Sequence, residues 1–164
     1  MSWLRRLIGV IFAIGVAIGA GILLLPLVAA VDPVTRSSGF ALMQLAVTAI
    51  LDTAVEEGGD NSGVAELTGF MWMAVAAVCV APPVTVALIG EVARVRAFAW
   101  YSGATGIGAA SAPWVIRAAL QLPRAVNYSS TELRFALVFF LTGVISGSVY
   151  WFLAGRGADG GRSV

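Results

Sequence analysis

Histidine and lysine are absent from this 164-residue sequence, and it contains a single cysteine, Cys79. These absences exclude the Ser-His-Asp triad, Cys-His catalysis, His- or Cys-based zinc sites, His-ligated haem, lysine Schiff bases and lysine-containing phosphate loops. An internal disulfide is excluded as well, because it needs two cysteines. Nothing in the sequence fixes a pair of acidic side chains in one pocket. We therefore expect no enzyme, no catalytic residue, no cofactor and no metal site.

Charged residues are also scarce, at 12% of the chain against about 25% in an ordinary soluble domain. Hydrophobic residues make up 59%, and the mean hydropathy is +0.92. The net charge is only +1, so no charge surplus would attract nucleic acid. This composition excludes a disordered chain and predicts an integral membrane protein.

The uncharged residues are gathered into four long runs. As helices rising about 1.5 Å per residue, these runs reach the roughly 30 Å hydrocarbon core of a bilayer. We predict an all-α fold, an integral membrane four-helix bundle that forms one domain over residues 1–155. A short cytoplasmic tail, residues 156–164, follows it. The predicted spans cover residues 7–31, 67–90, 97–119 and 134–155.

A further segment, residues 38–55, lies between the first and second spans and has a different pattern. Its polar residues recur every fourth position on one face: Gln44, Thr48, Asp52 and Glu56. Its apolar residues fall on another face: Phe40, Met43, Val47, Ile50 and Ala54. This spacing predicts an amphipathic helix in the membrane interface, with Ser37 or Ser38 as its N-cap. The alternative is a fifth, short span.

Arginine in short loops marks the cytoplasmic side of a membrane protein. With four spans, one side receives Arg5, Arg6, Arg94, Arg96, Arg156 and Arg162. The other side receives Arg36 and Arg124, with Arg117 and Arg134 at span borders. We therefore expect both termini to be cytoplasmic, in the bacterial cytoplasmic (inner) membrane. The first run imitates a signal peptide but is longer than the usual apolar region of one.

Glycine recurs at four-residue intervals inside the spans, and small residues let helix backbones approach closely in lipid. The predicted packing residues are Gly15, Gly19, Gly103, Gly106, Gly108, Gly143 and Gly147. Residues 97–119 have the smallest side chains, so we expect them to form the central helix. The alternative is that a glycine-rich composition creates such spacings by chance.

Prolines interrupt two of the spans. Pro82 and Pro83 fall near the middle of the second span, and Pro113 falls late in the third. Proline lacks a backbone donor and its ring clashes with the preceding turn, so a helix kink is predicted at these positions. Broken helices line substrate sites in many transporters, but kinks are also frequent in membrane helices without that role.

Two ionisable groups near span ends have local explanations. Glu91 is followed closely by Arg94 and Arg96, which predicts a solvated interfacial ion pair. Arg117 is expected to extend its long side chain toward the interface. In the loop before the fourth span, Ser129 and Glu132 have the spacing of a capping box.

No charged residue lies in the middle of a predicted span, which argues against a charge-coupled transporter. We expect a non-catalytic, small multi-pass membrane protein that acts through helix packing as an accessory, assembly or structural subunit. Its partners are expected to be the lipid bilayer and either its own copies or a membrane protein complex. The alternative is a small passive channel or transporter for a neutral solute, formed by an oligomer. Its lining would be Thr85, Ser102, Thr105, Ser111, Ser146 and Ser148.

Overall fold

The computed structural model describes residues 2–55, 62–119, 121 and 130–155. All regular elements in these ranges are helical, so the all-α prediction is confirmed. Three helical stretches in this part of the chain are long and apolar enough to cross a membrane: Leu4–Val31, Thr68–Ala93 and Ser130–Gly155. They indicate a membrane-embedded protein. The predicted tail, residues 156–164, lies outside the described residues.

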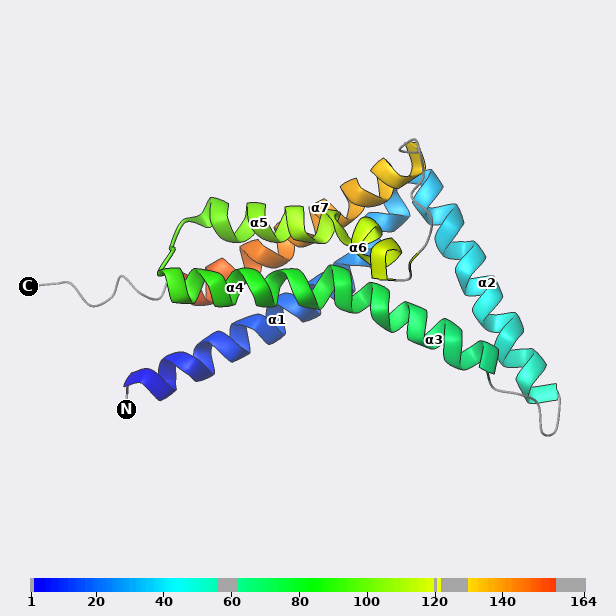
Figure 1. Ribbon diagram of the computed structural model, residues 1–164, viewed down its shortest axis with the longest axis horizontal. Coiled ribbons are helices and arrows are strands. Elements are labelled where there is room, and N and C mark those ends of the chain that lie inside the picture. The colour runs from blue at the N-terminus through cyan, green and yellow to red at the C-terminus, as the bar shows by residue number, and fades with distance from the viewer. Residues whose placement is uncertain (1, 56–61, 120, 122–129, 156–164) are drawn as a thin grey trace, which may run out of the picture.

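Four helices form the body of the fold: α1 (Ser2–Val31), α4 (Ala81–Ala93), α5 (Phe98–Ala110) and α7 (Ser130–Tyr150). They alternate in direction along the chain (Figure 1). The most extensive contacts are those of α7 with α5 and with α1, and α5 also packs against α4. The expected central position therefore belongs to α7 and not to residues 97–119. The reason is that α7 presents small residues to helices on two of its sides.

The second predicted span is a bent path of three elements: α3 (Ser62–Val75), the π-helical turn η1 (Ala76–Val80) and α4. Pro82 and Pro83 are the second and third residues of α4, directly after η1, and both are buried. A π turn widens the helix and changes which carbonyls face the next turn, which accommodates residues that lack an N–H group. The interruption of the span therefore lies just before the two prolines.

Residues 97–119, predicted as one span with a kink at Pro113, are divided into two helices. They form α5 and α6 (Ala112–Ala119), which are separated at Ser111. The Ser111 hydroxyl donates to the Gly108 carbonyl at 2.7 Å, and Pro113 is the second residue of α6. Neither piece alone has the length of a span, so this segment is not among the three spanning helices.

Helix α2 (Pro33–Val55) begins earlier than predicted. The carboxylate of Asp32 accepts hydrogen bonds from the Thr35 backbone N–H at 3.0 Å and from the Thr35 hydroxyl at 2.8 Å. Asp32 therefore serves as the N-cap, followed by proline at the first helical position, where a missing N–H does no harm. The predicted cap at Ser37 or Ser38 is wrong, because both hydroxyls donate to a carbonyl within the helix.

The two faces predicted for this segment are not cleanly separated along α2. Leu45 lies three residues before Thr48, and Leu51 lies seven residues after Gln44, so both leucines share the polar face. Large apolar side chains are exposed on several sides of the helix: Phe40, Met43, Leu45, Val47 and Leu51. Four predicted positions have side chains outside the described residues: Ile50, Asp52, Ala54 and Glu56.

Candidate functional site

The closest helix contact joins α5 to α7 and is built on Gly106, Gly143 and Gly147. A Cβ atom at Gly143 would lie 2.6 Å from the Thr105 carbonyl oxygen and 2.9 Å from the Cα atom of Gly106. A Cβ atom at Gly147 would collide with the Tyr101 carbonyl oxygen. Because these neighbours are backbone atoms, they cannot move aside unless the helices separate. The glycines therefore set the distance between α5 and α7.

The other predicted packing glycines have different surroundings. A Cβ atom at Gly108 would lie 3.1 Å from the Cβ atom of Pro82, which is a close contact between α5 and α4. At Gly15, Gly19 and Gly103, an added Cβ atom would meet nothing within 4 Å. The structure thus brings Gly106, Gly108, Gly143 and Gly147 to contacts between helices and leaves the other three positions open.

Three glycines outside the predicted packing set also lie near side chains: Gly90 and Gly155 at close contacts, and Gly21 at an ordinary van der Waals contact. A Cβ atom at Gly90 would lie 2.5 Å from the Tyr101 hydroxyl oxygen, and that hydroxyl donates to the Val95 carbonyl at 2.8 Å. A Cβ atom at Gly21 would lie 3.6 Å from the Cβ atom of Cys79. Gly69, the other glycine of the second predicted span, is 21 residues before Gly90, so no four-residue spacing marks Gly90. Gly21 is two residues from Gly19, outside the four-residue pattern.

Most of the hydroxyls considered as a pore lining donate to carbonyls of the chain itself. Four of them donate to a carbonyl three or four residues earlier: Thr85, Ser102, Ser111 and Ser148. Such local bonds satisfy a hydroxyl without a solute. Ser146 is buried and donates to the Ala17 carbonyl at 2.7 Å, so it joins α7 to α1. These hydroxyls serve helix structure and packing.

Three ion pairs among the described residues link helices near the two ends of the bundle. At the end where α1 begins, called here the Arg6 end, Arg6 Nη2 lies 2.7 Å from Glu91 Oε2. At the opposite end, called the Asp32 end, Arg134 Nη1 lies 2.9 Å from Asp32 Oδ1. The third pair, also at the Asp32 end, joins α6 to α7: Arg117 and Glu132. The first two pairs connect residues 85 and 102 positions apart, and the third connects consecutive helices through residues 15 positions apart.

The partners in two of these pairs differ from the local predictions. Glu91 bonds Arg6, 85 residues away, besides standing close in sequence to Arg94 and Arg96. Arg117 pairs with Glu132 instead of extending to the interface alone. The predicted capping partner of Glu132, Ser129, lies outside the described residues. Spacing along one helix cannot reveal partners on another helix, which is why these pairs were missed.

Asp32 combines capping with an ion pair at the Asp32 end. The backbone N–H of Thr35 lowers the pKa of Asp32 most, and the Thr35 hydroxyl and the Arg134 guanidinium lower this pKa further. Desolvation acts in the opposite direction but does not prevail. The carboxylate is therefore charged at neutral pH, and it ties the start of α2 to the start of α7.

Helix α4 ends in an unusual way at the Arg6 end. Arg94 has a φ of 54° and a ψ of 32°, in the left-handed region where glycine is favoured. The Arg94 N–H approaches the Glu91 carbonyl at 3.4 Å, and the Val95 N–H donates to the Gly90 carbonyl at 2.9 Å. These are the two bonds of a Schellman cap. Left-handed backbone at a residue other than glycine costs about 1–2 kcal/mol.

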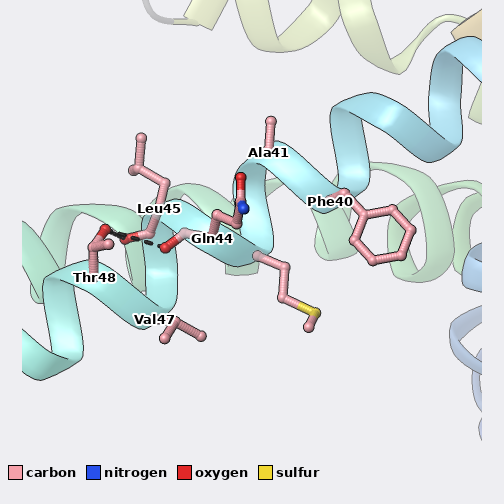
Figure 2. Close-up of a pocket in the computed structure, with 7 residues that line it drawn as sticks. Phe40, Ala41, Gln44, Leu45, Val47 and Thr48 are labelled. Atoms are coloured by element: carbon pink, nitrogen blue, oxygen red, sulfur yellow. Dashed lines mark hydrogen bonds between the residues drawn. The ribbon is translucent and has the colours of Figure 1, made fainter.

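The exposed surface of α2 carries a groove of about 500 Å³. Its lining consists of Phe40, Ala41, Met43, Gln44, Leu45, Val47 and Thr48. Figure 2 shows these side chains pointing away from the helix in several directions, while the Thr48 hydroxyl donates to the Gln44 and Leu45 carbonyls. None of the lining side chains is titratable, so the groove suits apolar contacts and not acid-base chemistry.

No cluster of three or more His, Cys, Asp or Glu side chains that could hold a metal ion occurs in the part of the chain that the structure describes. No known protein family matches the chain, and neither a curated protein nor a solved structure is significantly similar to it. The function is therefore inferred from the contacts described above.

Proposed function

We propose that this protein is a non-catalytic membrane subunit that acts by packing its helices against other membrane helices. These helices belong either to further copies of the chain or to a larger complex. The observation that carries the proposal is the path of α2, which begins beside α1 and α7, leaves the bundle and meets α3 (Figure 1). A helix that is apolar on most sides is normally buried. In this chain, α2 is left largely exposed.

Four membrane crossings account for this arrangement: α1, α3 with α4, α5 with α6, and α7. The third crossing is interrupted at Ser111, where α6 packs against α7 and η1. Irregular backbone at membrane depth is tolerated where protein surrounds it. We place α2 at the membrane surface, between the first two crossings, where its apolar side chains contact lipid and a partner.

The alternation of the four crossings places the start of α1 and the end of α7 at the same end of the bundle (Figure 1). Arg5, Arg6, Arg94 and Arg96 gather at that end. Arginine is retained on the cytoplasmic side during insertion, so the proposed orientation has the Arg6 end in the cytoplasm. The Asp32 end and α2 then face outward.

The polar side chains of α2 favour a protein partner over lipid alone. Gln44 lies on the exposed surface of the helix, in the groove among apolar side chains (Figure 2). A glutamine amide is poorly accommodated by lipid chains, and it forms hydrogen bonds across helix interfaces in membranes. A partner helix laid along this groove would supply both apolar contact and an acceptor or donor for the amide.

Photo-cross-linking in native membranes tests this proposal. A photoreactive residue is placed at Met43 or Val47 on α2, and a matched control carries it at Leu137, an exposed position on α7. We expect a protein adduct of defined mass from the α2 positions and lipid adducts from Leu137. Lipid adducts from all three positions would contradict the assembly role. Solute flux into liposomes above the protein-free background would support the pore alternative instead.

A further inference from the structure

A groove of about 650 Å³ lies between the start of α1 and the end of α4, at the Arg6 end. Its lining consists of Arg6, Leu7, Val10, Leu88, Glu91, Arg94 and Arg96. The apolar members lie toward the middle of the bundle, because Leu7 and Val10 follow Arg6 along α1 and Leu88 precedes Glu91 along α4. The side chain of Leu88 is 56% exposed, so the groove is open to the surroundings of the bundle.

The lining of the groove contains more guanidinium groups than carboxylates. Three guanidinium groups share the lining with one carboxylate, that of Glu91, which already bonds Arg6 at 2.7 Å. The backbone at Arg96 is anchored, since the Trp151 Nε1 donates to the Arg96 carbonyl at 3.0 Å. An excess of positive charge at one end of an apolar groove favours an anionic ligand with an apolar part.

Arg94 supplies an independent argument. Its backbone is held in the left-handed region, where glycine would remove the strain. A residue kept in an unfavourable conformation points to a use for its side chain. Here that side chain is a guanidinium on the rim of the groove, and guanidinium binds phosphate with two parallel hydrogen bonds.

We propose that this groove binds one anionic phospholipid. Arg94 holds the phosphate, and an acyl chain lies along Leu7, Val10 and Leu88. The order of polar and apolar groups in the groove is that of a lipid in a leaflet, with the headgroup at the end of the bundle and the chain directed inward. A zwitterionic headgroup carries a cation that the arginines repel. The inference depends on α1 and α4 being in a membrane and not on the assembly role of α2.

The test uses native mass spectrometry of the delipidated full-length chain in neutral detergent. The probes are dioleoylphosphatidylglycerol, dioleoylphosphatidylcholine and inorganic phosphate. We expect one phosphatidylglycerol to bind with clear preference over phosphatidylcholine. The Arg94→Gly variant should lower this affinity about tenfold or more, because a charge-assisted hydrogen bond is lost. It should keep or raise the melting temperature, since glycine suits the left-handed backbone.

The matched control is Arg36→Gln, which removes one exposed arginine from the Asp32 end and should leave lipid affinity unchanged. Equal losses in the two variants would overturn the proposal, because they would show attraction by overall charge. Equal binding of phosphatidylcholine would overturn the choice of an anionic headgroup. If inorganic phosphate displaces phosphatidylglycerol when both are at the same concentration, the groove binds the anionic group alone. That result would overturn the role of the acyl chain.

Discussion

Replacing Gly147 by alanine should push α5 and α7 apart. The new Cβ atom would collide with the Tyr101 carbonyl oxygen, and it would lie 2.8 Å from the carbonyl carbon and 2.9 Å from the Thr105 Oγ1. A flexible side chain can rotate away from such a contact, but a helix backbone moves only as a unit. The neighbouring residue, Ser146, bonds the Ala17 carbonyl, so a shift of α7 also disturbs its contact with α1.

The expected magnitude comes from two opposing effects. Overpacking a tight site costs about 1–3 kcal/mol. Alanine also improves helix propensity over glycine by up to about 1 kcal/mol, which partly hides this cost. The matched control is Gly103→Ala in α5, where the same gain in propensity applies and the added Cβ atom meets nothing within 4 Å. The difference between the two variants isolates the clash, at about 1–3 kcal/mol of unfolding free energy.

Thermal unfolding in a single detergent, followed by circular dichroism, would measure both variants beside the unmodified protein. We expect Gly147→Ala to melt below the unmodified protein or close to it, and Gly103→Ala to melt at the same temperature or higher. Similar gains in stability for the two variants would refute the reasoning. They would mean that α5 and α7 do not approach each other at Gly147.

Three other predictions concern single side chains. Hydrogen bonds lower the pKa of Asp32 from 3.8, so the ionised carboxylate stabilises the fold above that pH, and this stabilisation is lost as the pH falls through the lowered pKa. Asp32→Asn should remove this part of the acid dependence, measured by thermal unfolding at neutral and acidic pH. An unchanged acid dependence would count against the cap. Tyr101→Phe deletes the hydroxyl that donates to the Val95 carbonyl and should lower the unfolding free energy by about 0.5–1.5 kcal/mol, measured by the same melting assay. Cys79 is buried, so a maleimide should label it only after denaturation in SDS; rapid labelling of the folded protein would show that the bundle opens there.

Features that depend on local sequence could be predicted. The long apolar runs predict helices, because a backbone in an apolar environment must satisfy its own hydrogen bonds. The beginning of α2 was also within reach: Asp32 followed by proline is a typical helix start. A prediction based on the apolar pattern begins the helix after Arg36 instead, because Asp32 and Arg36 interrupt the uncharged sequence.

Features that depend on helix register could not be predicted. Glycine spacing identifies a small face on a helix, but not the helix that faces it. Gly103 and Gly106 are three residues apart in α5, yet only Gly106 lies against α7, where a Cβ atom would be 2.7 Å from the Val144 side chain. The break at Ser111 lies two residues before Pro113, close to a predicted kink, but its extent, a division into two helices, does not follow from hydropathy. Hydropathy registers only that the residues are apolar and not whether the backbone continues through them.

The two ends of the bundle use ion pairs in different ways. At the Asp32 end, each of two arginines pairs with one carboxylate on another segment, which holds the segments together. The opposite charges within each pair cancel, so these four groups add little net charge to that end. At the other end, three guanidinium groups share a groove with the carboxylate of Glu91. An excess of arginine at one end favours retention in the cytoplasm and attracts anionic headgroups. The proposed orientation and the proposed lipid site therefore have one physical origin.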